Sequence, residues 1–467
     1  MLFKKKHLFV VKYLRRVFKF AIYLPNKTFL FNLSMRISKK YTVKLTEALK
    51  HKLICWSQQF EEVVWLDSNE ESNFQSKSTY KAILALDAFT AIKTDYHQAF
   101  DQLEEYQSKT KDWLFGYLTY DLKNGVERLN SNNFDDLNFP DLYFFQPKKV
   151  FLFMENEVEI QYLHFVEDEL AFDWEEIINY KETYKASEST SIVKINSRTS
   201  KDSYFNKLHK ILEHIQRGDI YEANFCQEFY SDNTEIDAVK TFIHLNEISK
   251  PPFATFLKLG GLYSLSASPE RYISKNGTTI ISQPIKGTAR RHSDHSEDEK
   301  LKIELTNDPK ERSENIMITD LVRNDLSRFA KKGTVKVTEL CKVYSFSQVH
   351  QMVSTITCQV DINKSPVSII KETFPMGSMT GAPKISAMKI IENFEDAKRG
   401  LYSGAVGYFT PAGDFDFNVI IRSILYNLKN KYVSFSVGGA ITAKSIPEKE
   451  YEECLIKAKA MREVLEN

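Results

Sequence analysis

A lysine beside a glycine is the residue of this sequence best suited to covalent chemistry. Lys286 lies in the stretch 283–290 (QPIKGTAR), after a strand-like run at 278–282, and Gly287 beside it lets a ligand approach the main chain. Partial burial would lower the pKa of its ammonium group and so free the amine as a nucleophile. A surface lysine in a turn made by Pro284 and Gly287 explains the same residues without chemistry. The stretch alone leaves both interpretations open.

A glutamate upstream could work with this lysine. Glu270 follows a strand-like run at 263–268 and comes just before the strand that leads to Lys286. If the two strands form a hairpin, the carboxyl group lies near the amine, where it could act as a general acid. A structural salt bridge between the two side chains is the alternative.

A long helix predicted over 311–331 carries further polar side chains. Glu314, Arg323 and Asn324 are among them, and we expect that not all three face solvent. A mixed-charge helix is nevertheless most often a solvated surface, so the helix by itself does not establish a site.

The last predicted helix opens with a capping-box pattern at 445–448. Glu450, Glu453 and Lys457 follow at spacings of three and four, so the two carboxylates share one face. A surface ion pair between Glu453 and Lys457 is the simpler interpretation of the spacing alone.

Three stretches could hold an anion. The segment 375–384 (PMGSMTGAPK) brings glycines and hydroxyls to the start of a helix predicted over 385–394, where N–H groups suit a carboxylate or phosphate, although the P-loop pattern is not matched. Arg422, in a strand predicted over 417–425, could form a bidentate pair with a carboxylate. The glycines of 438–440 let a ligand approach the main chain.

Composition indicates a globular protein. The 467 residues are 42% hydrophobic and 27% charged, with a formal net charge of +1, so nothing in the overall balance calls for nucleic acid or an anionic membrane. The five cysteines are scattered and form no CxxC pair, which argues against a disulfide framework or a structural zinc site and fits a reducing cytoplasm. We expect a cytoplasmic protein without membrane spans.

The chain is predicted to have three parts. Residues 1–34 are a basic extension whose Lys and Arg interrupt every apolar run, which fits neither a signal peptide nor a membrane span. Two interpretations stay open: a basic amphipathic helix at a membrane surface, and a start codon assigned too early, since Met35 opens a second plausible amino terminus. An N-terminal subdomain is expected over 35–190, and a Ser- and Thr-rich linker over 186–199 leads to a catalytic domain over 200–467.

Taken together, these stretches resemble one family. The ordered motifs of 200–467 resemble the chorismate-utilising enzymes, and they are PIKGTARR, DPKERSENIMITDLVRNDLSR, VHQMVS, GSMTGAPK, LYSGAVGYF, VIIRS, VGGAI and EYEECLIKA. The resemblance implies an α/β (α+β) fold with large antiparallel sheets sandwiched between helices. It also implies chorismate as substrate and Mg²⁺ as cofactor, with the metal held by Glu314 and Glu453.

Two positions distinguish the members of this family. Anthranilate synthases typically have alanine where this chain has Lys286, whereas lysine in PIKGT resembles aminodeoxychorismate synthase component I. Isochorismate and salicylate synthases carry a water-activating lysine at the position of Glu222, so that base is missing here. Anthranilate synthase component I and a catalytically silent chorismate-binding relative remain the alternatives.

The resemblance also implies roles for single residues. Lys286 would attack C2 of chorismate while Glu270 protonates the departing C4 hydroxyl, and ammonia would then displace the lysine by attack at C4. The implied substrate-binding residues are Gly287, Thr288, His350, Thr380, Tyr402, Arg422, Gly438, Gly439 and Ala440.

Two further expectations concern ligands and partners. The stretch 65–68 resembles a piece that helps to bind tryptophan in related enzymes, so Asp67 and Ser68 mark a possible site for a tryptophan-like ligand. The sequence has no glutaminase signature such as GxCxGxQ, which implies that ammonia comes directly or from a separate glutamine amidotransferase subunit.

Overall fold

The computed structural model describes residues 35–69, 80–181, 193–346 and 349–466. Residues Arg36–Asn467 form one compact unit. The predicted basic extension at 1–34 and the first half of the predicted linker, 186–192, lie outside the described residues.

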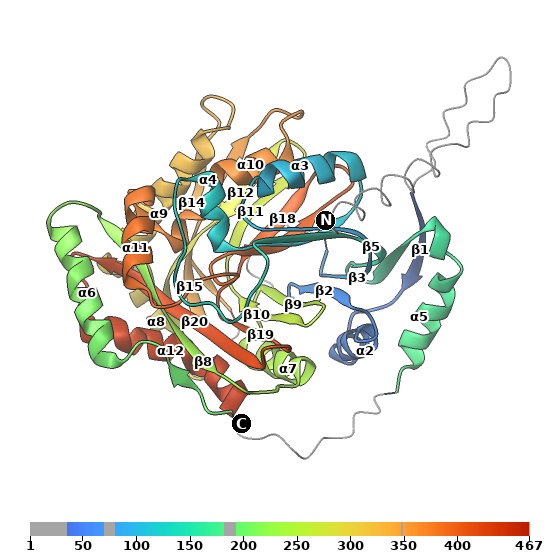
Figure 1. Ribbon diagram of the computed structural model, residues 1–467, viewed down its shortest axis with the longest axis horizontal. Coiled ribbons are helices and arrows are strands. Elements are labelled where there is room, and N and C mark those ends of the chain that lie inside the picture. The colour runs from blue at the N-terminus through green and yellow to red at the C-terminus, as the bar shows by residue number, and fades with distance from the viewer. Residues whose placement is uncertain (1–34, 70–79, 182–192, 347–348, 467) are drawn as a thin grey trace, which may run out of the picture. The chain divides into compact units, whose positions relative to one another are not determined.

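The first part of this unit is mostly antiparallel sheet with helices at its ends (Figure 1). Its elements are β1 (Arg36–Thr42), α2 (Glu47–Ser57), β2 (Glu62–Asp67), β3 (Ala82–Thr94), α3 (Ala99–Thr110), β4 (Leu114–Leu118), α4 (Lys123–Val126), β5 (Leu142–Phe153), β6 (Glu157–Leu163) and α5 (Glu169–Asn179), with 3₁₀ turns at Tyr120–Leu122 and His164–Val166.

The second part alternates strands with longer helices. Its elements are β7 (Asn196–Ser197), α6 (Lys201–Gln216), β8 (Glu222–Ser231), α7 (Ala238–Ser249), β9 (Phe253–Leu259), β10 (Leu262–Ser268), β11 (Arg271–Asn276), β12 (Thr279–Gln283), β13 (Ile285–Arg290), α8 (His295–Asn307), α9 (Pro309–Ser327), β14 (Lys336–Ser345), β15 (Val349–Gln359), α10 (Pro366–Thr373), a 3₁₀ turn at Gly377–Met379, β16 (Gly381–Ala382), α11 (Lys384–Phe394), β17 (Ala405–Phe409), β18 (Phe415–Val419), β19 (Ser423–Asn427), β20 (Tyr432–Thr442) and α12 (Pro447–Glu466).

The strands form two antiparallel arms that diverge from β5. One arm runs in the order β5-β3-β2-β9-β10-β19-β20-β8, and the other in the order β5-β4-β17-β18-β11-β12-β15, where β15 also pairs with β13 and β14. The β2–β9 and β4–β17 pairings join residues from both sides of the predicted linker. The predicted fold class, large antiparallel sheets with helices, is confirmed.

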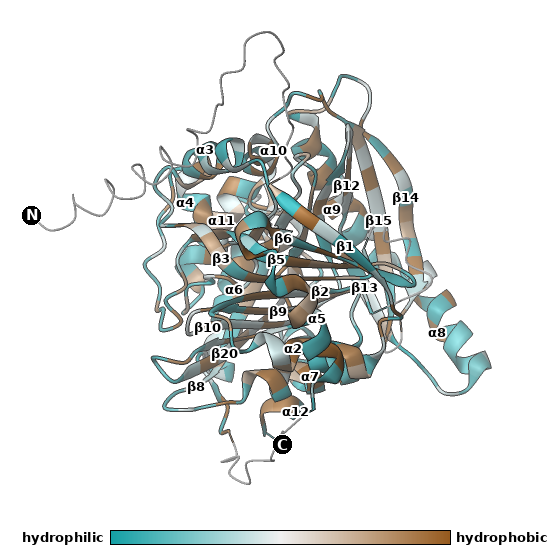
Figure 2. Cartoon of the chain, turned by 90° about the vertical axis from the view of Figure 1, so that its right-hand side faces the viewer, coloured by the Kyte–Doolittle hydropathy of each residue, from teal (hydrophilic) through white to brown (hydrophobic). Residues whose placement is uncertain are grey.

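Two hydrophobic cores lie on opposite faces of the first arm. Along β2, Val63 and Trp65 belong to one core while Val64 between them belongs to the other, as the two-residue period of a strand requires. The first core lies under helices that include α2, α6, α7 and α12, and the second lies between the arms. Figure 2 shows the hydrophobic colour of the central strands and the hydrophilic colour of α8, whose Leu305 is buried.

The predicted strand over 417–425 is wrong, because the chain bends inside it. β18 ends at Val419 and β19 begins at Ser423, and Arg422 between them has φ of 54°. That left-handed conformation is uncommon for a residue with a side chain and breaks the extended run. Arg422 therefore sits at a corner between the two arms instead of in a ladder.

Candidate active site

A β-bulge positions Lys286. Ile285 pairs with Val353 and Thr288 with Gln351, so Lys286 and Gly287 together face a single residue of β15. A bulge of this kind redirects a side chain away from the regular alternation of its strand. Gly287 has φ of 94°, and a Cβ there would lie 3.2 Å from both Glu311 Oε2 and Met352 Cβ. Glycine is therefore required for this turn of the chain.

Four glutamates surround the ammonium group of Lys286. Glu222 Oε1 lies 3.6 Å from Lys286 Nζ, and Glu314, Glu270 and Glu453 act on it electrostatically. Burial lowers the pKa of Lys286, but the four carboxylates together raise it above its ordinary value. The predicted lowering of this pKa is therefore wrong, because the sequence did not reveal how many negative charges converge on the amine.

The hairpin expected between 263–268 and 278–282 does not form, because β10 pairs with β9 and β19 while β12 pairs with β11 and β15. Glu270 nevertheless acts electrostatically on Lys286, as was expected of a nearby carboxyl group. It directly precedes β11, whose first residue pairs with Gln283 at the end of β12, and the chain then continues to Lys286. Its carboxyl group is buried and accepts a hydrogen bond of 2.5 Å from Ser378 Oγ. Burial raises the pKa of Glu270 to about 7, although Ser378 and Lys286 oppose the rise. A carboxyl group with this pKa is partly protonated near neutral pH and can act as a general acid.

Helix α9 carries Glu314 and also holds the lysine strand. Asp308 caps its first turn by accepting from Lys310 N and Glu311 N. One turn on, Glu314 is buried, and burial raises its pKa to about 7. The next residue, Asn315, donates through Nδ2 to the carbonyl oxygens of Lys286 (3.3 Å) and Met352 (3.1 Å).

The two other polar residues singled out on this helix have no part in the cluster. Arg323 and Asn324 are exposed, and Arg323 pairs with Asp320 one turn away. Of the three polar residues expected not all to face solvent, only Glu314 is buried.

Helix α12 places carboxylates over β20. A Cβ on Gly439 would lie 3.4 Å from Glu450 Oε2 and 3.7 Å from Glu453 Oε1. Burial tends to raise the pKa of Glu453, but Lys457, 2.6 Å away, helps to hold it below its ordinary value. Lys457 Nζ also donates to the carbonyl oxygen of Gly438 (2.8 Å). The ion pair between Glu453 and Lys457, which the sequence favoured as a surface pair, therefore lies beside residues 438–440 at the candidate site.

These carboxylates fit a hard divalent cation. Glu314 Oε1 is buried without a hydrogen-bond partner among the described residues, and its nearest cation is Lys310 Nζ at 3.8 Å. Lys310 Nζ also lies 3.5 Å from Glu450 Oε1, so one ammonium bridges carboxylates from α9 and α12. Within the described ranges, no three potential ligands gather as a protein-only metal centre. Mg²⁺ commonly uses one or two protein carboxylates and takes its remaining oxygens from substrate and water.

A second group of residues could receive a carboxylate. Removal of the Arg422 guanidinium from water lowers its pKa, and the opposing influence of Tyr402 and Glu453 does not restore it. Tyr402 is buried, and its hydroxyl lies 3.5 Å from Cys226 Sγ. β19 pairs with β20 only as far as Ser434, so among described residues the outer edge of β20 has no strand neighbour at 438–440. Every second main-chain N–H group of 438–440 points to that open edge, where it could donate a hydrogen bond to a ligand.

The remaining predicted binding residues lie nearby with different surroundings. Both ring nitrogens of His350 contact protein groups, Ser345 Oγ at 2.9 Å and Asp298 Oδ1 at 3.0 Å, so the ring faces α8. Thr380 is buried and donates to the carbonyl oxygen of Gly377 (3.0 Å). Thr288 is exposed on β13. Their predicted contacts with substrate stay predictions.

The possible site for a tryptophan-like ligand has a cation of its own. Asp67 ends β2 and is buried, with Lys50 Nζ of α2 at 2.8 Å from its Oδ2. Ser68 Oγ donates to the carbonyl oxygen of Lys81 (2.9 Å). The Asp67 carboxylate is thus already paired with a cation of the chain, and binding of a tryptophan-like ligand beside it stays a prediction.

Two polar neighbours of Lys286, Asn315 and Glu222, were not predicted to contact it. Asn315 follows Glu314 directly, and a polar residue on the buried face of a helix was a signal that could have found it. Glu222 was considered only as the position of a missing base, whereas the structure places its carboxylate in contact with the lysine. Its strand is buried at almost every position, which makes a carboxylate there conspicuous.

Comparisons with known proteins agree with the motifs. The family model described as chorismate binding enzyme matches residues 46–463. An anthranilate synthase component I-like protein from Synechocystis sp. is 33% identical over 355 residues, which cover 76% of this chain and 72% of that protein. Aminodeoxychorismate synthase component 1 of Escherichia coli is 38% identical over 270 residues, which cover 58% of this chain and 59% of that protein. The match to the Escherichia coli protein thus spans less than two thirds of that protein's length.

A solved structure shares the fold. Anthranilate synthase component I from Streptococcus pneumoniae TIGR4 aligns with a TM-score of 0.72 and 25% identity, covering 81% of this chain and 91% of that chain. No helix in the described part of the chain is both long and apolar enough to cross a membrane. The family match extends over nearly the whole compact unit, including the elements that carry Lys286, Glu270, Glu314 and Glu453. The chain therefore belongs to the chorismate-binding enzyme family.

Proposed function

We propose that the chain is an aminodeoxychorismate synthase component I, which converts chorismate and ammonia to 4-amino-4-deoxychorismate for 4-aminobenzoate and folate biosynthesis. The observation that carries this proposal is the bulge that turns Lys286 toward Glu222, Glu270, Glu314 and Glu453. A lysine at this point can serve as a nucleophile, which the alanine typical of anthranilate synthases cannot. Relatives named aminodeoxychorismate synthase support the same choice.

Each side chain then has a role in the reaction. The amine of Lys286 attacks C2 of chorismate as the ring double bonds shift and the C4–O bond breaks. Glu270 gives its proton to the departing hydroxyl, which leaves as water. Ammonia next attacks C4, the double bonds shift back and the amine of Lys286 is released. The new amino group returns a proton to Glu270, so both residues regain their starting forms.

Binding groups hold the two carboxylates of chorismate apart. Glu314 and Glu453 would hold Mg²⁺, which supplies positive charge for the ring carboxylate when it is bound. Arg422, Tyr402 and the open edge of β20 receive the enolpyruvyl carboxylate. Because desolvation disfavours the charge of the half-buried Arg422, an anion beside its guanidinium would offset part of that cost.

Intact-protein mass spectrometry tests the covalent step. With chorismate and Mg²⁺ but no ammonia, native enzyme should gain the mass of chorismate less water, and Lys286→Ala should lack this species. Lys336→Ala, an exposed lysine of β14, is the matched control and should keep it. A coupled lyase assay for 4-aminobenzoate, run with ammonium, should report the native product.

Anthranilate synthase component I is the second candidate. A relative with that name from Thermus thermophilus is 33% identical over 362 residues, which cover 76% of this chain. Anthranilate as native product, with no adduct on Lys286 under any trapping condition, would replace the first proposal with this one.

The source of ammonia is part of the same proposal. We propose that a separate glutamine amidotransferase subunit supplies it, because the chain carries no glutaminase signature. The isolated chain should then use ammonium but not glutamine. Turnover of glutamine by the purified chain alone would contradict this.

A further inference from the structure

Glu222 is a buried carboxylate beside Lys286 that the reaction above does not use. Its side chain is 1% exposed, and Oε1 lies 3.6 Å from Lys286 Nζ. Its second oxygen, Oε2, is buried without a hydrogen-bond partner among the described residues. A buried carboxylate oxygen without a donor is costly, so its retention beside the amine needs a reason.

The backbone around Glu222 is fixed by strands on both sides. Glu222 pairs with Thr442 of β20 and with Ala382 of β16. A Cβ on Gly381 would lie 2.1 Å from the carbonyl oxygen of Glu222, so only glycine permits this approach. Because strands on both sides, β20 and β16, hold its main chain, the carboxylate is presented to Lys286 from a rigid support.

The amine must lose a proton before it can attack carbon. The carboxylates of Glu222, Glu270, Glu314 and Glu453 face it from β8, the start of β11, α9 and α12, and together they favour the ammonium form. Among described residues, Glu222 is the one that forms an ion pair with Lys286 within 4.0 Å. Glu270 already serves the C4 hydroxyl, and Glu314 and Glu453 are the proposed metal ligands.

We propose that Glu222 is the general base that accepts a proton from Lys286 as its nitrogen bonds to C2 of chorismate. The N–H bond breaks, its proton forms a carboxylic acid on Glu222, and the freed electron pair forms the C–N bond. When ammonia later displaces the lysine, Glu222 returns the proton and the ammonium form is restored. This role rests on the proposed covalent function of Lys286.

The rate of adduct formation tests this role. In Glu222→Gln, adduct formation at neutral pH should slow by about 10²-fold or more, and the rate should rise more steeply with pH because the proton must go to solvent. A merely electrostatic role predicts the opposite result. Removing a negative charge would favour the neutral amine and would speed adduct formation. An unchanged or faster rate in Glu222→Gln would therefore overturn the proposal.

A second variant, Glu222→Asp, tests the same role without removing the carboxylate. Glu222→Asp retains the carboxylate but withdraws it by one methylene, so its rate should lie between those of native enzyme and Glu222→Gln, with the native pH slope. A fully native rate in Glu222→Asp would also contradict the proposal. Rates are measured on protein whose cooperative melting has been verified.

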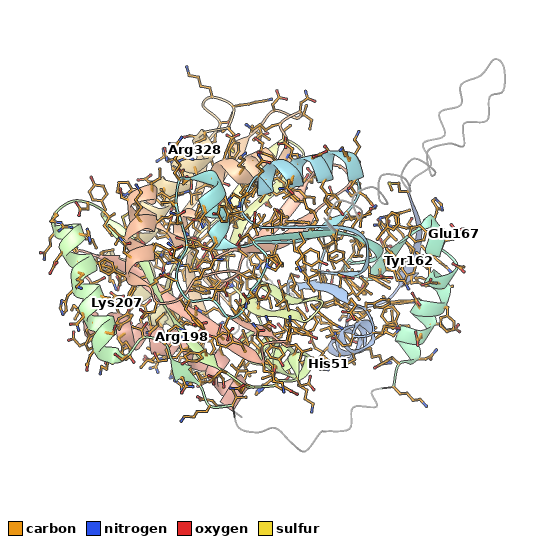
Figure 3. All side chains as sticks on the ribbon, in the orientation of Figure 1. His51, Tyr162, Glu167, Arg198, Lys207 and Arg328 are labelled. Atoms are coloured by element: carbon orange, nitrogen blue, oxygen red, sulfur yellow. The ribbon has the colours of Figure 1, made fainter. Side chains whose placement is uncertain are left out.

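Glu228→Gln is the matched structural control. Glu228 lies on the same strand and is buried, but its Oε2 pairs with Arg198 Nε at 2.6 Å, and Arg198 is labelled in Figure 3. This variant should melt at a lower temperature and keep the native pH profile of adduct formation. Native enzyme that forms no adduct would refute the function of Lys286 itself. A native adduct with an unaffected Glu222→Gln would refute only the role of Glu222.

Discussion

At the scale of single residues, the types of side chain in the sequence were enough to identify candidates for the chemistry. Lys286 was singled out because of the glycine beside it and Glu270 because of an expected hairpin, and the structure places both in one cluster although that hairpin does not form. The direction of the lysine pKa was not predictable. It depends on carboxylates from four separate elements, and sequence spacing does not show that these elements converge.

A pH profile tests Glu270 as the acid. A group with a pKa of about 7 that must be protonated loses activity as the pH rises through 7. The hydroxyl of Ser378 donates to Glu270 and so lowers its pKa. In Ser378→Ala that stabilisation of the carboxylate is lost, so the basic limb of kcat should move to higher pH by on the order of one unit.

The control for this profile is another buried hydroxyl. Ser282 Oγ donates to the carbonyl oxygen of Tyr272 (2.6 Å), which does not titrate. Ser282→Ala should lower the melting temperature and leave the limb in place. A limb that stays fixed or moves to lower pH in Ser378→Ala would show that Glu270 is not the acid.

Substitution of the two proposed metal ligands tests the cation site. Glu314→Gln and Glu453→Gln should each remove Mg²⁺-dependent activity and the Mg²⁺ binding seen by calorimetry with chorismate, with nearly unchanged melting. Because burial raises the pKa of Glu314 to about 7, native Mg²⁺ affinity should increase as the pH rises through 7 and the proton leaves. Glu297→Gln, on an exposed turn of α8, is the control. Near-normal Mg²⁺ binding in either variant would exclude that glutamate as a ligand.

At the scale of elements, the periodicity of apolar residues predicted where helices and strands lie. It did not predict the bulge and the corner that interrupt two of the strands. The helix that follows GSMTGAPK was predicted over 385–394 and is observed over Lys384–Phe394. The bulge at Lys286 and the corner at Arg422 were not predicted, because each depends on pairing with a distant strand. These two irregularities are what direct both side chains toward the site.

The bulge can be tested through its glycine. Gly287→Ala places a methyl group 3.2 Å from two neighbouring atoms in a backbone with φ of 94°, so the bulge must shift. We expect a loss of about 1–3 kcal/mol in the free energy of unfolding and a sharp decrease in adduct formation on Lys286. Urea denaturation and intact mass measure the two effects.

Gly218→Ala separates backbone strain from displacement of Lys286. Gly218 has φ of 80°, and a Cβ there would meet nothing within 4 Å. Its substitution should also destabilise the fold but leave adduct formation intact. Equal adduct formation in the two variants would mean that the bulge does not position the lysine.

At the scale of the whole molecule, the sequence indicated sheets and helices but not how the two halves join. Strand β4, from the first half, pairs with β17, and β2 pairs with β9 across the same predicted boundary. Such pairings join residues far apart in sequence, and no local pattern specifies them. The site depends on this arrangement, because its groups come from both arms of the strand network and from α9 and α12.

The amino-terminal edge of the compact unit gives the last prediction. β1 begins at Arg36, whose buried guanidinium donates to Asp112 Oδ1 (2.8 Å) and Oδ2 (3.0 Å). A chain that starts at Met35 keeps this pair, so we expect it to melt and turn over ammonia as the full chain does. Arg36→Ala should instead cost about 3–5 kcal/mol in urea denaturation, because it leaves the carboxylate of Asp112 buried without its cation. Lower melting or lost activity on starting at Met35 would show that the stability of the unit depends on residues before its first strand.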